Sequence, residues 1–163
     1  MNKTYQFIPA NRSDYGNILS LFQSPDELFM IYPSATWPFD LAQLNKLSDQ
    51  RTDLTVALKG DMVIGFANLY RNLSGDKVFV GNVVISQAYR GKGVGRQLVC
   101  HMCDKVFDCY ANEVHITVFN QNTPALALYT SLGFKPYNLE LREKPNGEPA
   151  IAIHMQLNRR SWH

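Results

Sequence analysis

The segment that decides the fold runs from Val78 to Gly95 and has the sequence VFVGNVVISQAYRGKGVG. Its first eight residues are an almost continuous apolar run, which predicts a buried strand over 78–85. Apolar residues then recur at helical spacing from Val94 to Tyr110, which predicts an amphipathic helix. The glycine-rich sequence Arg90–Gly95 therefore lies where a strand gives way to the N-terminus of a helix.

A glycine-rich connection at the N-terminus of a helix is suited to binding a phosphate or pyrophosphate. The first N–H groups of the helix lack partners inside it, and the helix dipole places partial positive charge there. Glycines let an anion approach the main chain, and basic side chains beside them add positive charge. The residues concerned are Arg90, Gly91, Lys92, Gly93, Gly95 and Arg96. Taken alone, the same sequence also suits a surface loop that needs glycine for its turns.

Two other phosphate-binding motifs do not fit. The sequence lacks the Gly-x-x-x-x-Gly-Lys-Ser/Thr pattern of an NTPase P-loop. Its glycines follow the spacing Gly-x-Gly-x-Gly rather than Gly-x-Gly-x-x-Gly, and a hairpin-rich half precedes them, which disfavours a dinucleotide-binding fold.

The rest of the chain predicts a single α/β (α+β) domain over residues 1–163, with one mixed sheet. Apolar and alternating runs predict about seven strands. They are expected at Tyr5–Pro9, Leu54–Lys59, Met62–Tyr70, Val78–Ile85, Val114–Phe119, Tyr137–Arg142 and Ile151–Leu157. Helical spacing and capping residues predict about four flanking helices. Their signals are N-caps at Ser13 and Asp40, the start at Val94, and a helix from Pro124 that ends before Gly133. A short helix and loop are expected in the aromatic-rich segment Asp26–Phe39, and a hairpin at Gly60–Asp61.

Composition and charge limit the class of protein. The chain has 163 residues, 45% of them hydrophobic and 18% charged, as in an ordinary globular domain. A net charge of +2 favours neither nucleic acid nor a membrane surface as a partner. No apolar run reaches the roughly 20 residues of a membrane helix, and the sequence from Met1 has no signal-peptide core. Three cysteines do not make a disulfide framework, so we expect a cytoplasmic protein.

Two motifs resemble those of the GCN5-related N-acetyltransferase (GNAT) family. The family's acyl-CoA signature, Gln/Arg-x-x-Gly-x-Gly/Ala, is matched by Arg90, Gly93 and Gly95. Its second signature, Asn-x-x-Ala-x-x-Leu-Tyr-x-x-Leu-Gly-Phe, is matched at Asn122, Ala125, Leu128, Tyr129, Leu132, Gly133 and Phe134. The expected order of elements also agrees with that of the family. The resemblance implies a mostly antiparallel sheet that is splayed at its centre.

The resemblance further implies acetyl-CoA as the co-substrate. In the family, the strand before the glycines binds the pantetheine arm through its main chain, and the glycine-rich connection binds the pyrophosphate. The cofactor-binding residues implied here are Val83, Val84, Ile85, Arg90, Gly91, Lys92, Gly93, Val94, Gly95, Arg96 and Asn122. The N–H group of Ile85 or Val84 would polarise the thioester carbonyl.

The catalytic residue that the resemblance implies is Tyr129, as general acid at the leaving thiolate. A phenol can donate a proton to a basic leaving group; the alternative is a half-buried aromatic on a packed helix face. Many relatives carry a glutamate on the strand before the glycines, but residues 78–85 include no acidic residue. The amine would then lose its proton through a water held by Asn82 or by main-chain carbonyls, or to Asp26, Glu27 or His115. Without a strong base, α-amines (pKa about 7.7–8.0) are favoured over lysine (about 10.4).

Aromatic residues are the candidates for the acceptor site. Family members cover that site with their first two helices, which correspond here to the segment Asp26–Phe39. The candidate acceptor residues are Tyr32, Trp37, Tyr70 and Asn82. The alternative is that these aromatic residues only cover the core.

Cys100 and Cys103 have the spacing of a metal or redox pair, but neither chemistry is favoured. A structural zinc site needs a second such pair. A reactive thiol is favoured near a helix N-terminus, and these cysteines lie well inside the predicted helix. We expect buried or half-buried helix cysteines and no metal.

These patterns together predict an acetyl-CoA-dependent N-acetyltransferase. The acceptor would be a primary amine of a small molecule or of a peptide or protein, which attacks directly in a ternary complex. The alternative is a non-catalytic acyl-CoA-binding module of the same fold. Dimers are frequent in the family, so a homodimer is the assembly to be tested.

Overall fold

A computed structural model gives the structure of residues 4–162, and residues 1–3 and 163 of the predicted domain lie outside the described part. Seven strands are hydrogen-bonded in the order β1-β2-β3-β4-β5-β7-β6. They are β1 (Gln6–Pro9), β2 (Thr52–Lys59), β3 (Met62–Arg71), β4 (Val78–Ile85), β5 (Glu113–Phe119), β6 (Lys135–Glu143) and β7 (Pro149–Asn158). The predicted mixed sheet of seven strands is confirmed.

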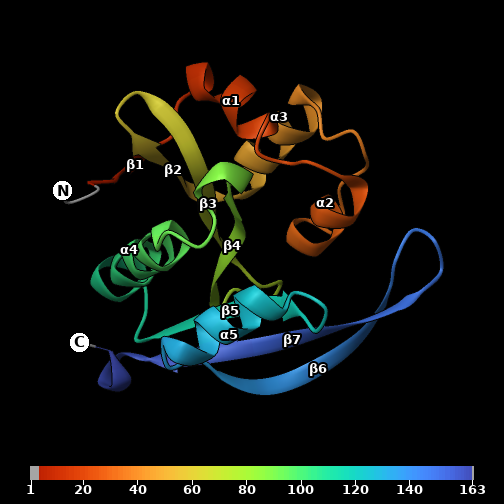
Figure 1. The fold of residues 1–163 in the computed structure, drawn as a ribbon. Coiled ribbons are helices and arrows are strands. Elements are labelled where there is room, and N and C mark those ends of the chain that lie inside the picture. The colour runs from red at the N-terminus through yellow and green to blue at the C-terminus, as the bar shows by residue number, and fades with distance from the viewer. Residues whose placement is uncertain (1–3, 163) are drawn as a thin grey trace. The chain divides into compact units, whose positions relative to one another are not determined.

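Five α-helices occur in the described range 4–162 (Figure 1). They are α1 (Tyr15–Leu19), α2 (Pro25–Ile31), α3 (Leu41–Gln50), α4 (Val94–Cys109) and α5 (Thr123–Ser131). Three short 3-10 helices lie at Arg12–Asp14, Gln87–Tyr89 and Arg159–Ser161. No helix within these residues is long and apolar enough to cross a membrane.

The chain divides into two compact units. The first contains the chain up to Tyr70 together with Gly81–Met102, and the second contains Arg71–Val80 and the chain from Cys103 onward. The division falls inside β4 and inside α4. The single domain expected over residues 1–163 stays a prediction.

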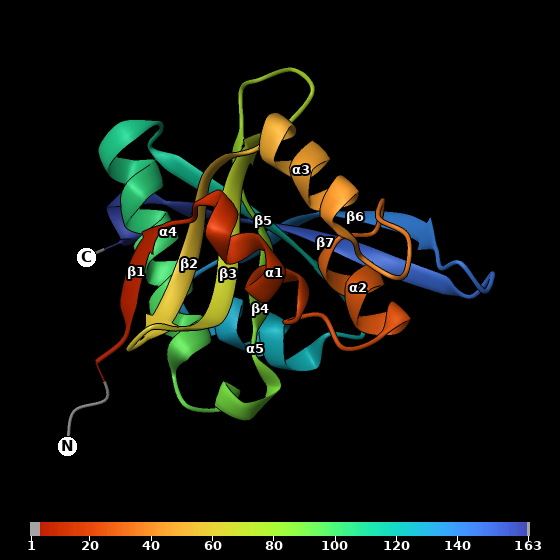
Figure 2. The same ribbon diagram turned by 90° about the horizontal axis from the view of Figure 1, so that it is seen from above.

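The first unit combines the antiparallel strands β1, β2 and β3 with α1, α2 and α3. The predicted hairpin joins β2 to β3, with Gly60 at a φ of +60°. Ile18 of α1 and Leu44 and Leu47 of α3 are almost fully buried and share a core with Phe66 of β3. In Figure 2, α1 and α3 lie next to each other in this unit. Apolar residues at helical spacing therefore pack onto the strands as expected.

Of the two N-caps predicted in the first unit, one is confirmed and one is wrong. Asp40 caps α3 as predicted, because its Oδ1 accepts a hydrogen bond from the N–H of Gln43 at 3.0 Å. The prediction that Ser13 caps the first helix is wrong. The cap is Asn11, whose Oδ1 accepts from the Ser13 N–H at 3.0 Å while Asp14 accepts from the Asn11 N–H at 2.9 Å. This reciprocal capping box satisfies two N–H groups and starts a 3-10 helix before α1.

The second unit is built on β5, β6 and β7. β4 pairs with β5 in parallel from Val78–Val114 to Val80–Ile116, and β7 pairs antiparallel with both β5 and β6. The parallel pairing is short, and the splay at the centre of the sheet stays a prediction. Gly133 ends α5 with a φ of +104°, as predicted for its position after the helix.

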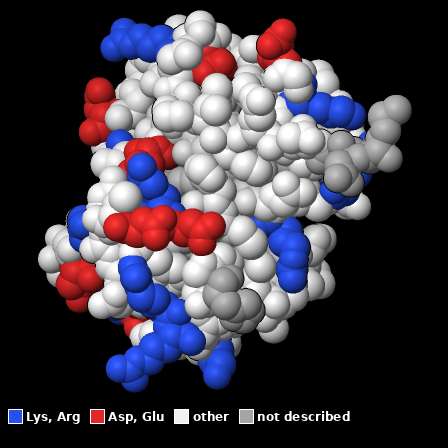
Figure 3. All heavy atoms as spheres, turned by 90° about the vertical axis from the view of Figure 1, so that its left-hand side faces the viewer, with Lys and Arg blue, Asp and Glu red and all other residues white. Residues whose placement is uncertain are grey.

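Charged side chains of both signs are interspersed on the face shown in Figure 3. Much of that face carries neither sign of charge. This distribution agrees with the small net charge of +2.

Candidate active site

The glycine-rich connection begins directly after β4. The chain leaves the strand at Ile85, makes the 3-10 turn Gln87–Tyr89 and enters α4 at Val94. Gly91 and Gly93 have φ values of +73° and +86°, a region that side chains with a Cβ rarely adopt. The glycines are therefore required here by backbone conformation, which explains why the sequence pattern marks this segment.

Two lysines flank an aromatic ring at this connection. The Nζ atoms of Lys59 and Lys92 lie 5.4 Å and 5.2 Å from the centroid of the Tyr89 ring. Lys92 was expected at this site, whereas Lys59 comes from the end of β2 and has no motif around it. Both ammonium groups add positive charge to the side of the helix N-terminus where an anion is expected.

Two contacts of its side chain hold Arg90 in place. Its Nη2 lies 2.9 Å from the carboxylate Oε1 of Glu27 in α2, and its Nε donates to the carbonyl oxygen of Ile85 at 3.1 Å. The Glu27 side chain is 15% exposed, so the ion pair is partly shielded from water. Arg90 thus joins α2, the end of β4 and the glycine-rich connection.

The main chain of β4 has one edge directed away from β3. The N–H of Ser86 donates to the carbonyl of Ile64 in β3 at 2.8 Å. In an antiparallel pair, successive residues direct their N–H and C=O groups to opposite sides. The main-chain groups of Ile85 and Val83 are therefore directed away from β3, whereas those of Val84 are directed toward it.

Asn122 and Tyr129 belong to α5 and its cap in the second unit. The Oδ1 of Asn122 accepts a hydrogen bond from the N–H of Ala125 at 3.4 Å, so this motif residue caps the helix. Tyr129 is 5% exposed, and its ring lies 6.0 Å from that of Phe134. Burial, with a smaller contribution from Cys103, raises the pKa of the Tyr129 hydroxyl. The group is thus protonated at neutral pH, as a proton donor must be.

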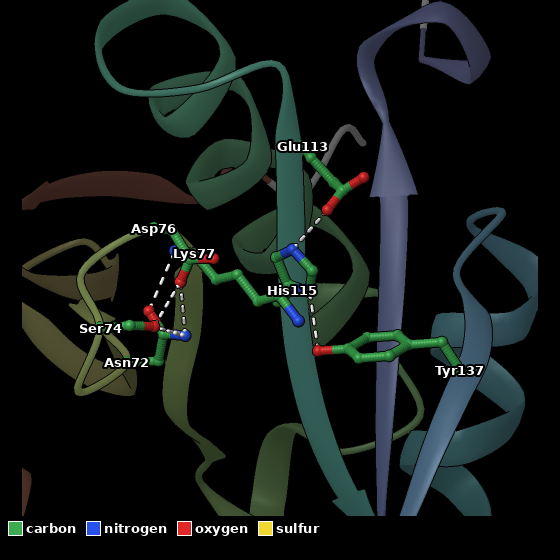
Figure 4. A network of polar contacts seen from close by, with 7 residues as sticks. All are labelled: Asn72, Ser74, Asp76, Lys77, Glu113, His115 and Tyr137. Carbon is green, nitrogen blue, oxygen red and sulfur yellow. Dashed lines mark hydrogen bonds and ion pairs between the residues drawn. The ribbon is translucent and has the colours of Figure 1, made fainter.

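Both ring nitrogens of His115 have a polar partner in the second unit (Figure 4). Its Nε2 lies 2.7 Å from Oε1 of Glu113, and its Nδ1 lies 2.9 Å from the hydroxyl of Tyr137. The ring is 1% exposed, and burial lowers the pKa of His115 although Glu113 opposes this shift. With Nε2–H donating to Glu113, Nδ1 accepts from Tyr137. A free base would require one of these contacts to break.

The candidate base residues in the first unit differ in their surroundings. Asp26 is exposed on the first turn of α2, and Glu27 is paired with Arg90. Asn82 has both ends of its carboxamide occupied: Oδ1 accepts from Asn68 at 2.9 Å, and Nδ2 donates to the carbonyl of Ile31 at 3.0 Å. Asn82 therefore joins β3, β4 and α2, and it does so with an unusual φ of +53°.

Two of the four predicted acceptor residues flank one arginine, and a third, Asn82, is joined to it through Asn68. The guanidinium carbon of Arg51 lies 3.9 Å from the Tyr70 ring centroid and 5.6 Å from that of Tyr32. Its Nη1 lies 3.4 Å from Oδ1 of Asn68, which in turn binds Asn82. Tyr32 is also part of the hydrophobic core, so the expected alternative holds for it as well.

Trp37 is the predicted acceptor residue that does not join this group. It is 44% exposed, in the connection between α2 and α3.

Arg51, Lys59 and Asn68 are the residues of this region that the sequence did not reveal. Asn68 lies inside the mainly apolar strand β3, Lys59 is the last residue of β2, and Arg51 stands between α3 and β2 among other polar residues. No motif surrounds them, and only the pairing of β2, β3 and β4 could have indicated their positions.

The three cysteines are free thiols in different environments. Cys100 is half-buried, Cys103 is buried and Cys109 is exposed. Across residues 4–162, His, Cys, Asp and Glu form no cluster of three that could hold a metal ion.

Comparisons with known proteins agree with the fold and the motifs. A family model described as "Acetyltransferase (GNAT) family" matches residues 18–134. Streptothricin acetyltransferase from Streptomyces lavendulae is 31% identical over 112 residues, which are 68% of this chain and 59% of that protein. The N-alpha-acetyltransferase RimI of Mycobacterium tuberculosis is 30% identical over 109 residues, 64% of this chain and 66% of that protein. The chain thus spans less than two thirds of the length of either relative.

A solved structure of similar fold is that of spermidine N-acetyltransferase from Vibrio cholerae in complex with CoA and spermine. It has a TM-score of 0.81 and 19% sequence identity, and the match covers 98% of each chain.

Proposed function

The chain belongs to the GNAT acetyltransferase family, and from that premise we propose that it transfers an acetyl group from acetyl-CoA to a primary amine. The observation that carries this proposal is the glycine-rich connection between β4 and α4. Its positive φ values at Gly91 and Gly93 expose main chain at a helix N-terminus, which is suited to a pyrophosphate.

The space around the two glycines fits a bound diphosphate. A Cβ placed on Gly91 would meet nothing within 4 Å, and one on Gly93 would meet only the flexible Gln97 side chain, at 3.9 Å. The main chain therefore faces open space, and Lys59 and Lys92 supply positive charge nearby. Chemically, N–H donors and ammonium groups are the partners that a diphosphate requires.

The direction of the β4 main chain supports a role for Val83 and Ile85 in holding the pantetheine arm. Their N–H and C=O groups lie on the edge of β4 that does not pair with β3. Of the two expected donors to the thioester carbonyl, this favours the N–H of Ile85 over that of Val84. A fixed main-chain donor stabilises the negative charge that develops on the carbonyl oxygen.

The reaction is a direct transfer within a ternary complex. The amine nitrogen forms a bond to the acetyl carbon, the C–S bond of the thioester breaks, and the sulfur leaves with a proton. Tyr129 would donate that proton. The proton of the amine would pass to water, because Glu27 is paired with Arg90 and both ring nitrogens of His115 are occupied, while Asp26 is exposed. Holding both reactants together supplies most of the rate enhancement.

The acceptor is a primary amine. Two relatives carry names that specify acetylation of streptothricin and N-alpha-acetylation. The absence of an acidic residue from 78–85 favours an amine of low pKa, which loses its proton to water more readily than lysine does.

Binding and turnover are tested separately. Acetyl-CoA at 100 times its Kd stabilises a protein by about 2.7 kcal/mol, which for this size raises Tm by roughly 5–10 °C. Turnover is then measured as free thiol released with a panel of amines. An absent shift contradicts the assignment of the glycine-rich connection. A shift without turnover on any amine would support the non-catalytic alternative instead.

A further inference from the structure

Arg51 is a cation without a carboxylate partner among residues 4–162. It lies between α3 and β2, partly buried, and its contacts are two aromatic rings and one long hydrogen bond to Asn68. A guanidinium carries five N–H donors in a planar fork. Only one of these N–H donors, on Nη1, has a hydrogen-bond acceptor among residues 4–162.

Holding such a group out of water is costly when no anion offsets it. Burial lowers the pKa of Arg51, and the nearby Tyr70 and Tyr32 oppose this effect. Arginine does not give up its proton at neutral pH. The unpaired charge is therefore a permanent feature of this structure, and a bound anion would relieve its cost.

The β4 backbone fixes the position of the guanidinium. A Cβ built on Gly81 would lie 2.6 Å from Nη1 of Arg51, 2.8 Å from Cε1 of Tyr70 and 2.9 Å from Oδ1 of Asn68. Only glycine lets the three side chains approach the strand this closely. The next residue, Asn82, has a φ of +53° inside the strand, a strained conformation typical of functional sites.

The location of Arg51 relates it to the proposed reaction. Gly81 precedes Val83 by two residues, and a strand rises about 3.3 Å per residue, so roughly 7 Å of strand separates Arg51 from the first residue proposed to hold the acyl donor. An oxyanion bound at Arg51 would leave an amine a few bonds away close to that main chain.

We propose that the guanidinium of Arg51, held against Gly81 and stacked on Tyr70, binds an oxyanion of the amine acceptor. The acceptor class is then an amine that carries an acidic group, and a carboxylate is the anion that best matches the planar fork. This inference rests on the proposed function, because it names the substrate class of the same site. A polyamine offers no partner for Arg51 and would be repelled by it.

The experiment compares acceptors with and without an acidic group, at equal concentrations of the unprotonated amine, because a neighbouring carboxylate raises the pKa of the amine. Amino acids, their amides and aminoalkylphosphonates are acetylated by the wild type, by Arg51→Gln and by Lys46→Gln. The control removes one positive charge from an exposed position on α3. We expect the wild type and Lys46→Gln to prefer the carboxylate over the amide by about tenfold or more in kcat/KM. Arg51→Gln loses this preference through KM, and Arg51→Lys keeps part of it.

A binding measurement separates this inference from the proposed function. N-acetylated amino acids and their amides are titrated into each protein without acetyl-CoA, and the Tm shift by acetyl-CoA is recorded in parallel. Carboxylate binding that Arg51→Gln abolishes supports the inference whether or not turnover is found. Equal use of carboxylate and amide by the wild type, or a preference that survives in Arg51→Gln, overturns it. A phosphonate preferred to the carboxylate would keep the oxyanion site and replace the carboxylate as its ligand.

Discussion

Replacing Gly81 by alanine tests whether the β4 backbone fixes Arg51. Gly81 does not have a positive φ, so alanine brings no backbone strain, and its whole effect comes from the added methyl group. That methyl would lie under 3.0 Å from Arg51, Tyr70 and Asn68 at once. The end of the Arg51 side chain can move aside, whereas Asn68 is fully buried and bonded to Asn82.

The expected cost follows from this overlap. An added methyl in a tightly packed site costs about 1–3 kcal/mol. In a chain of this length that corresponds to a loss of roughly 2–12 °C in Tm. The displaced Arg51 also loses its position over Tyr70, so KM for a carboxylate-bearing acceptor rises while the Tm shift produced by acetyl-CoA stays near that of the wild type.

The matched control is Gly16→Ala in α1. A Cβ there meets nothing within 4 Å, and alanine favours a helix over glycine by about 1 kcal/mol. We expect the control to raise Tm slightly and Gly81→Ala to lower it. If Gly81→Ala has the Tm of the wild type and keeps its acceptor preference, the close approach of Arg51 to β4 does not hold this site together.

Three further predictions concern the cofactor, the acid and pH. Gly93→Ala should weaken acetyl-CoA binding by about tenfold in calorimetry, because a left-handed residue with a Cβ costs about 1–2 kcal/mol. Gly75→Ala, also at a positive φ but in the turn between β3 and β4, should leave the affinity unchanged. Tyr129→Phe should lower kcat by about 100-fold or more with an unchanged Kd for acetyl-CoA, and wild-type turnover in this variant would remove Tyr129 from the mechanism. Because burial lowers the pKa of His115 in the folded protein, the unfolded chain takes up its proton first, near pH 6.5. Stability measured in urea should therefore fall as pH decreases below about 6.5, and His115→Gln should flatten that slope; a parallel slope in both proteins contradicts it.

The parts of the fold that follow from local sequence were predictable. The apolar run at 78–85 forms β4 with its expected ends. The helix α4 begins only at Val94, because Gly91 and Gly93 before it have positive φ values that a right-handed helix does not allow. The wrong cap at Ser13 shows the limit of this approach. Asn11, Ser13 and Asp14 are all good capping residues within four positions, and the reciprocal pair of Asn11 and Asp14 satisfies more N–H groups than Ser13 can.

The backbone conformation on the proposed cofactor side was predictable from the sequence, whereas the residues gathered around Arg51 were not. Glycine conformation and helix-terminal charge are local properties, so a short motif records them. Arg51 acquires its role only when α3, β3 and β4 bring Asn68, Tyr70 and Gly81 around it, and that arrangement leaves no pattern in any one segment. His115 shows the reverse case: its position suggested a base, but Tyr137, from a strand further along the chain, occupies its second nitrogen.

The helix α2 explains how the two sides of the proposed site are held together in the first unit. Near its start, Glu27 pairs with Arg90 of the glycine-rich connection, and at its end the carbonyl of Ile31 accepts from Asn82. The two contacts lie on either side of the stretch 83–85 proposed to hold the acyl donor. Ion pairs at a surface contribute little, but a partly buried pair that loses one partner leaves an unpaired charge behind. The segment that supports Tyr32 beside Arg51 is thus fixed by Asn82 and Arg90, the same residues that border the donor stretch. This accounts for a buried polar residue at Asn82, where a purely structural strand would carry an apolar one.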